Sequence, residues 1–246
     1  MLTSNQRKYR KASGFSLIEM AVVLLIISAL LGGLLVSVGT TREVGNRNST
    51  EDALQDIVDA LYGFAQANDR LPCPATAASN GFSAPAAAGP CSVGTTFTAG
   101  FVPSGTLGLS GRLNVNNLLS DAWGNPYRYV VTNAAASAFT SANMGSETVA
   151  NLATQANLQI CDSASCAAVV ANNLPAVVLS MGANWAAFTG ADEVENSGEI
   201  TVAGYRMPNN LDFVTSGYVE DVFDDMLNWV SPNLLVSKMI AAGQLP

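Results

Sequence analysis

The apolar positions of this chain are concentrated near its N-terminus, in an almost unbroken run over residues 15–38. At about 1.5 Å per helical residue, the run is long enough to cross a hydrocarbon core about 30 Å thick. Four basic residues come just before it, namely Arg7, Lys8, Arg10 and Lys11. This positive-inside pattern predicts that the N-terminus stays in the cytoplasm and that the rest of the chain lies outside.

One carboxylate, Glu19, interrupts the apolar run. A charge in lipid is costly and needs a partner, but the run contains no Lys, Arg or His that could provide one. We therefore treat Glu19 as a candidate functional residue whose partner lies outside this segment.

A second pattern begins after the polar residues 40–48. Over residues 51–67, the apolar side chains recur three and four positions apart, which predicts an amphipathic helix. The apolar stripe consists of Leu54, Ile57, Val58, Leu61 and either Phe64 or Ala65. Ser49 or Thr50 would cap this helix, and Pro72 lies just beyond its expected end. We expect one long helix from residue 15 to about residue 68, with a first half for lipid and a second half for a globular head.

The next part of the chain predicts a loop region followed by short strands. Residues 71–105 are rich in Ala, Ser, Pro and Gly, which is typical of loops. The turn residues at 121–126 lead into the alternating segment 127–131, which predicts a strand. Two further strands are predicted at residues 157–161 and 176–180, and we expect both to extend the same sheet.

The tail of the chain shows helical spacing. Apolar residues of the segment 219–230 recur at three- and four-residue intervals, which predicts a helix. Ser231 and Pro232 then read as the N-cap and first-turn proline of a second helix that ends near Ala242. We expect these two helices to pack on the head, although their apolar faces also suit contact with a neighbouring subunit.

The four cysteines fall as two locally spaced pairs, Cys73 with Cys91 and Cys161 with Cys166. Outside the cytoplasm, this usage favours disulfides over reactive thiols. Four cysteines allow three pairings, and we favour the two local ones. A zinc site is the alternative, but the chain has no histidine and neither pair has Cys-x2-Cys spacing.

Charge and composition exclude several functions. The formal net charge is −8. A broad nucleic-acid-binding groove is therefore not expected. Without histidine, Ser–His and Cys–His catalysis are excluded, and no glycine-rich phosphate-binding motif is present.

The segment Gly14-Phe-Ser-Leu-Ile-Glu19, preceded by basic residues and followed by the apolar run, resembles the N-terminus of type IV pilins and of type II secretion pseudopilins. The resemblance implies cleavage between Gly14 and Phe15 by a membrane-embedded prepilin peptidase, which also methylates the new amino group. It also implies that Glu19 meets the N-terminal ammonium of a neighbouring subunit during assembly. Two opposite charges in lipid become tolerable when they meet. An ordinary secretory signal is the alternative, but its cleavage site would follow the apolar region.

This resemblance implies a pilin-like α+β fold, in which a long N-terminal helix packs on a small antiparallel sheet with C-terminal helices. The expected organisation is a leader peptide at residues 1–14, a transmembrane and filament-core helix at 15–38, an amphipathic second half at 39–70, and a periplasmic globular head at 71–246. The chain would be a single-pass inner-membrane protein before it enters a pilus or pseudopilus.

Two further similarities to pseudopilins lie in the head. The sequence Asp-x-Trp-Gly-x-Pro-Tyr at residues 121–127 is similar to the segment that leads into their sheet. The polar loop after residues 180–184 looks like the loop that binds calcium in some major pseudopilins. Its candidate ligands are Asp192, Glu193, Glu195 and Glu199. Clustered carboxylates suit a hard cation, but their spacing does not match an EF-hand, and a solvated acidic loop is the alternative.

We therefore expect a structural subunit and not an enzyme. Its expected partners are other pilin or pseudopilin subunits, the prepilin peptidase, an inner-membrane assembly platform and the membrane itself. The length of the chain favours a minor pilin or pseudopilin. A membrane-anchored periplasmic enzyme or binding module that never enters a filament is the alternative.

Overall fold

The computed structural model of this 246-residue chain describes residues 14–245. The description leaves out residues 93–94, 135–137, 142–143, 188–189, 199 and 220–221, together with the side chains of residues 32–40 and 200. Residues 1–13 of the predicted leader and the candidate calcium ligand Glu199 therefore lie outside the described residues.

The first element is one helix, α1 (Leu17–Asn68), in agreement with the long helix predicted from residue 15 to about residue 68. The chain divides into two compact units, residues 1–45 and residues 46–246, and α1 contributes to both. In the first unit, every side chain over residues 15–31 is exposed. In the second, α1 buries one face, formed by Leu54, Ile57, Val58, Leu61, Tyr62 and Ala65. The amphipathic stripe predicted for this half is confirmed.

A four-stranded antiparallel sheet forms the centre of the second unit. Its strands are β1 (Phe97–Phe101), β2 (Arg128–Thr132), β5 (Ala176–Ser180) and β9 (Met226–Val230), in the order β1-β2-β5-β9. All residues of β2 and β5 are buried, because both faces of this sheet are covered. Strands at almost the positions of β2 and β5 were predicted from the sequence, whereas β1 was not.

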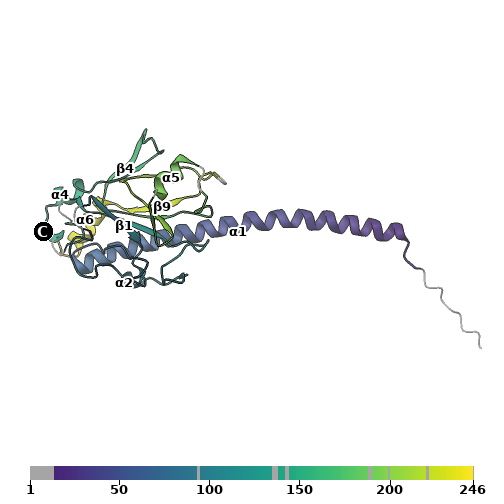
Figure 1. The fold of residues 1–246 in the computed structure, drawn as a ribbon, viewed down its shortest axis with the longest axis horizontal. Coiled ribbons are helices and arrows are strands. Elements are labelled where there is room, and N and C mark those ends of the chain that lie inside the picture. The colour runs from purple at the N-terminus through teal and green to yellow at the C-terminus, as the bar shows by residue number, and fades with distance from the viewer. Residues whose placement is uncertain are drawn as a thin grey trace, which may run out of the picture. The chain divides into compact units, whose positions relative to one another are not determined.

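Alternate residues of the central strands face two different layers, as the pleat of a strand requires. Tyr129, Val131 and Val178 belong to the core that includes the buried stripe of α1. Figure 1 shows this half of α1 next to β9, where Asn228 Nδ2 donates to Gln55 Oε1 of the helix at 3.1 Å. Val130 and Val177 belong instead to a second core on the opposite face.

The second core lies against a smaller sheet. It contains β3 (Leu158–Cys161), β4 (Val169–Leu174) and β8 (Asp212–Val214), in the order β4-β3-β8. Strand β3 is antiparallel to β4 and parallel to β8. The strand predicted at residues 157–161 is therefore present, but it belongs to this sheet and does not extend the four-stranded one. A separate hairpin contains β6 (Ile200–Val202) and β7 (Tyr205–Met207).

Short helices complete the head. They are α2 (Ser104–Leu107), the 3-10 helix η1 (Met144–Ser146), α4 (Val149–Thr154), α5 (Ala191–Ser197) and α6 (Pro232–Ala241). Helix α6 begins as predicted, with Ser231 at the N-cap and Pro232 in the first turn. The α+β class expected from the sequence is confirmed: an N-terminal helix is followed by an antiparallel sheet and a C-terminal helix.

Two disulfides are present in the head. Cys73 is bonded to Cys91 and Cys161 to Cys166, with Cα atoms 5.3 Å and 4.9 Å apart. These are the two local pairings that the sequence favoured. The Cys161–Cys166 bond closes the turn between β3 and β4.

The helix predicted over residues 219–230 is wrong, because its last five residues form β9. Met226 and Val230 pack on the core that includes α1. Leu227 and Trp229 pack on the second core, on the opposite face of the sheet. Side chains of a strand alternate between its two faces in this way. Every residue of β9 is paired with β5, so hydrogen bonds in the sheet replace those of a helix. Five apolar residues at helical spacing fit both structures over so short a segment.

The acidic loop predicted after residues 180–184 contains a helix, α5. Gly190 is its N-cap, and Asp192 and Glu193 lie in its first turn, where acidic side chains complement the positive end of the helix dipole. Gly198, at the C-cap, adopts a positive φ of 65°, and a Cβ atom there would lie 2.1 Å from the carbonyl oxygen of Met207. Glycine is therefore required where the chain leaves α5.

Candidate functional site

The N-terminal site begins at Glu19, whose carboxylate forms a capping box with Ser16. Glu19 Oε2 accepts a hydrogen bond from the backbone N–H of Ser16 at 2.9 Å, and the Glu19 N–H donates to Ser16 Oγ at 3.3 Å. These bonds satisfy donors that the start of a helix would otherwise leave without partners. The Glu19 carboxylate is therefore held at the N-terminal end of α1, close in sequence to the predicted cleavage site between Gly14 and Phe15.

Sequence reasoning missed this local partner because it looked only for a counter-ion. The Ser-x-x-Glu spacing of residues 16–19 was the available signal. A neutral N–H group does not remove the charge of Glu19, so the capping box positions the carboxylate without neutralising it.

The apolar segment that follows Glu19 is not covered by any other described residue of the first unit. Its large side chains are exposed from Leu17 to Leu31, and Leu25, for example, is 70% exposed. Within the described part of the chain, no helix combines the length and the apolar character needed to cross a membrane. The span predicted over residues 15–38 includes residues 32–38, whose side chains lie outside the description.

A second candidate site lies inside the head, where three buried acids converge. Glu193, Asp224 and Asp225 each direct one carboxylate oxygen to a place where these atoms lie within 4.8 Å of one another. Their side chains are 0%, 5% and 8% exposed. Glu193 comes from α5, whereas the two aspartates immediately precede β9.

One oxygen of each acid is held by neutral donors. Glu193 Oε1 accepts from Asn184 Nδ2 at 2.7 Å, and Asp225 Oδ2 accepts from Asn196 Nδ2 at 2.9 Å. Asp224 Oδ2 accepts from the backbone N–H groups of residues 183 and 184, at 2.6 and 3.2 Å. These bonds fix the orientation of all three carboxylates.

Further side-chain oxygens of the residues in and around the cluster lack a hydrogen bond among the described residues. Glu193 Oε2, Asp225 Oδ1 and Asn184 Oδ1 are buried and have no partner among the described residues. Such orphaned acceptors are rare in native proteins because each loses its hydration on burial. The carboxylate oxygens that converge in this cluster are the kind of ligand that suits a hard cation.

The pKa of Asp225 is affected by burial and by the two neighbouring acids. Burial raises the pKa of Asp225 well above its usual range, the hydrogen bond from Asn196 opposes that rise, and the neighbouring acids Glu193 and Asp224 add to it. Glu193 and Asp224 are negative when ionised, as Asp225 is, so both disfavour its ionised form. A cation among these acids would favour their ionised forms.

The turn at residues 121–125 positions the loop that brings Asn184 to the cluster. Asp121 Oδ1 accepts from the Asn125 N–H at 2.8 Å, and Asp121 Oδ2 accepts from Ser180 Oγ at 2.6 Å. Asn125 Nδ2 then donates to the carbonyl oxygen of Gly182 at 2.8 Å. The Asp-x-Trp-Gly-Asn segment, noted in the sequence for its likeness to a pseudopilin segment, therefore anchors the chain where it leaves β5.

Gly182 allows that loop to approach Asp224 closely. Its φ is +58°, and a Cβ atom built on it would lie 2.2 Å from Asp224 Oδ1. Both the left-handed backbone and the short distance require glycine. The hydrogen bonds from residues 183 and 184 to Asp224 depend on this approach.

Of the four calcium ligands predicted from the sequence, only Glu193 belongs to the described cluster. Asp192 Oδ1 accepts instead from the Ala164 N–H at 2.8 Å, and Glu195 Oε1 is bonded to Asn210 Nδ2 at 2.5 Å. Asp224 and Asp225 were missed because their segment was assigned to a helix. An adjacent pair of acids between apolar residues was the signal for a turn at that position.

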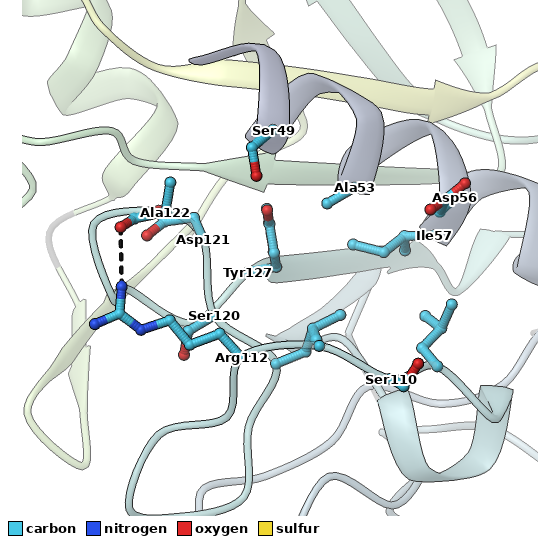
Figure 2. A pocket seen from close by; sticks show the side chains of 13 residues that line it. Ser49, Ala53, Asp56, Ile57, Ser110, Arg112, Ser120, Asp121, Ala122 and Tyr127 are labelled. Atoms are coloured by element: carbon cyan, nitrogen blue, oxygen red, sulfur yellow. Dashed lines mark hydrogen bonds between the residues drawn. The ribbon is translucent and has the colours of Figure 1, made fainter. Parts of the chain in front are cut away.

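A separate cavity of about 260 Å³ lies between the second half of α1 and the loop of residues 109–122. Figure 2 shows Tyr127 pointing toward α1 and Arg112 at the side of the cavity. Arg112 Nη1 donates to the carbonyl oxygen of Ala122 at 2.9 Å, and Asp121 holds the turn described above. Since these two charged side chains already serve the fold, we assign the cavity no chemistry.

The comparisons with known proteins bear on the first of these sites. Residues 9–35 match the family model of the prokaryotic N-terminal methylation motif. The chain carries this methylation motif. It is the class III signal peptide of type IV pilins and pseudopilins, and the match includes Gly14, Phe15 and Glu19. No curated protein and no solved structure matches the chain.

The methylation motif fits a membrane-anchored pilin and implies contact with other pilin subunits and with a prepilin peptidase. It covers only residues 9–35, so the head carries no family assignment of its own. The motif favours a structural subunit over an enzyme.

Proposed function

We propose that this protein is a structural subunit of a type IV pilus or a type II secretion pseudopilus, and specifically a minor pilin or pseudopilin. The observation that carries the proposal is the methylation motif at residues 9–35, directly at the start of a helix that runs into the head. The first part of α1 exposes its apolar side chains, whereas residues 54–65 are built into the core.

In this proposal, prepilin peptidase cuts between Gly14 and Phe15 and methylates the amine of Phe15. The mature subunit waits in the inner membrane, with its head in the periplasm, until an assembly platform draws it into a filament. The exposed apolar surface of residues 15–31 would then pack against the same segment of neighbouring subunits. Nucleic acid has no role in this scheme, because the chain is acidic.

Glu19 sets the register of the filament in this proposal. Its capping box with Ser16 holds the carboxylate at the end of α1 nearest the new amine. The N-terminal ammonium of the adjacent subunit then supplies the counter-ion. An ion pair in a low-dielectric core is strongly attractive, and loss of one partner leaves the other charge uncompensated.

The length of the chain beyond α1 favours a minor subunit over a major one. The head includes a second sheet and a separate hairpin in addition to the four-stranded sheet that packs on α1. We propose that these additions provide surface for contacts other than those of α1, and that few copies of the subunit enter each filament.

The experiment compares Glu19→Ala with Glu51→Ala in cells that make the filament. Both substitutions remove one exposed acid from α1, but Glu51 lies in the half that belongs to the head. We expect both variants to be cleaved and to reach the membrane at the parental level. Only Glu19→Ala should be depleted, at least about tenfold, from the sheared filament fraction. Breaking a buried ion pair costs about 3–5 kcal/mol, and a tenfold change requires only about 1.4 kcal/mol.

Equal incorporation of Glu19→Ala and the parent would refute the role of Glu19 in register. If neither the parent nor the control appears in filaments, while both remain in the membrane, the chain is instead a membrane-anchored binding module or enzyme.

A further inference from the structure

We propose that Glu193, Asp224, Asp225 and Asn184 form a calcium-binding site inside the head. The inference rests on the geometry of the head alone and is independent of the proposed filament function. It replaces the ligand set expected from the sequence, in which only Glu193 was shared.

The acids are too close and too buried to be a solvated cluster. Their nearest ligand atoms lie within 4.8 Å of one another, and none of the three side chains is more than 8% exposed. Like charges at such distances repel strongly away from water. A solvated acidic surface, the alternative suggested by the sequence, is therefore excluded for these three residues.

The unsatisfied atoms point to a ligand and not merely to a strained core. Glu193 is fully buried, yet its Oε2 atom has no hydrogen-bond partner among the described residues. The same holds for Asp225 Oδ1 and for the side-chain oxygen of Asn184. All three are acceptors, and Glu193 and Asp225 belong to the acids whose ligand atoms lie within 4.8 Å of one another. Asn184 is hydrogen-bonded to Glu193, so we propose that one cation serves all three acceptors, which one hydrogen-bond donor could not do.

The surrounding hydrogen bonds orient these acceptors before any ion binds. Asn184 Nδ2 donates to Glu193 Oε1 at 2.7 Å, which leaves Asn184 Oδ1 and Glu193 Oε2 for a ligand. Asn196 Nδ2 fixes the other oxygen of Asp225 at 2.9 Å, and Asn196 Oδ1 accepts from the Val214 N–H at 2.7 Å. Supporting contacts of this kind commonly orient the ligands of metal sites.

The chemical type of the ligand atoms indicates which metal ion would bind. All the candidate ligands are oxygen atoms, which disfavours zinc and other ions that prefer nitrogen or sulfur. Three carboxylates and an amide from the protein suit calcium, which accepts six to eight oxygen ligands in flexible geometry. Magnesium demands a stricter geometry and usually keeps several waters, so it should bind more weakly.

A calcium ion here would join three segments that are distant in the sequence. Asn184 belongs to the loop after β5, Glu193 to α5, and Asp224 and Asp225 to the segment before β9. Since β5 and β9 are paired neighbours in the central sheet, the ion would tie α5 to the end of that sheet. The head should therefore be more stable with calcium than without it.

The test uses the full-length protein in detergent micelles, after treatment with a chelator. Calcium is titrated by isothermal calorimetry, and thermal unfolding is followed with excess calcium or with chelator. We expect one calcium ion per chain and a rise in the unfolding midpoint of about 5–10 °C when calcium is about 100-fold above its dissociation constant. Magnesium at the same concentration should give a smaller shift.

Two matched variants locate the site. Glu193→Gln keeps the shape of the side chain but removes one charge and one ligand oxygen. Glu195→Gln makes the same change two residues away, where the side chain bonds to Asn210 and not to the cluster. Glu193→Gln should weaken calcium binding at least about 100-fold and abolish the calcium-dependent shift, whereas Glu195→Gln should retain both.

The variant Glu193→Gln also gives a result without calcium. Its amide can donate a hydrogen bond to the neighbouring acids, so in chelator it should unfold at the same temperature as the parent or higher. A folded parent that binds no calcium at millimolar concentration would overturn the proposal. So would a Glu193→Gln protein with parental calcium affinity, or one that unfolds well below the parent in chelator.

Discussion

The two halves of α1 should respond differently to the same substitution, because only the second half belongs to the core of the head. Leu61 is fully buried in the cluster that also contains Tyr129 and Val178, whereas Leu25 is 70% exposed. We compare Leu61→Ala with Leu25→Ala in the full-length protein in detergent micelles.

The expected magnitude follows from the burial of Leu61. Truncation of a fully buried leucine to alanine costs about 2–5 kcal/mol, because apolar contact is lost and a cavity remains. Taking about 3 kcal/mol for a head of this size, the thermal midpoint should fall by about 6–12 °C. Leu25→Ala removes an exposed side chain and should change the free energy of unfolding by less than about 0.5 kcal/mol.

The measurement is thermal unfolding followed by near-ultraviolet circular dichroism, which reports the tertiary packing of the aromatic side chains in the head. Equal shifts for the two variants would refute the division of α1 into two halves with different packing. An unshifted midpoint for Leu61→Ala would show that α1 is not part of the folded core.

The two disulfides should contribute unequally to the stability of the head. Replacing Cys73 and Cys91 by serine opens a loop of 18 residues, which should cost about 3 kcal/mol, and a parental urea midpoint would contradict this. Replacing Cys161 and Cys166 opens a loop of only 5 residues and should cost about 2 kcal/mol in the same assay. A larger loss from the second pair than from the first would contradict the loop-closure explanation.

The long helix could be predicted from the sequence because its patterns are local and extended. The apolar run, the amphipathic stripe from Leu54 to Ala65 and the Ser231-Pro232 start of α6 each rest on neighbours within a few turns. Strands β2 and β5 were also found, since buried apolar segments bounded by turn residues have few other structures available.

The errors arose where distant contacts decide the structure. Residues 226–230 satisfy both a helical and an extended pattern, and pairing with β5 selects the strand. The partition of β3 into a second sheet depends on its pairing with β4 and β8, which no local pattern encodes. Tertiary pairing therefore overrides local spacing in the later half of the chain.

The acidic cluster could not be assembled from sequence spacing for the same reason. Asn184 and Glu193 were both visible in one predicted loop, but Asp224 and Asp225 reach them only because β9 pairs with β5. The local sequence also did not distinguish Glu193, which faces the cluster, from Glu195, which bonds to Asn210.

The most direct test of the proposed function is mass spectrometry of the N-terminal peptide of the protein recovered from sheared filaments. The proposal predicts a chain that begins at Phe15, carries one methyl group on its amine and is absent from filaments when the peptidase is inactive. Recovery from filaments of a chain that retains residues 1–14, or of one that begins at another residue, would contradict it.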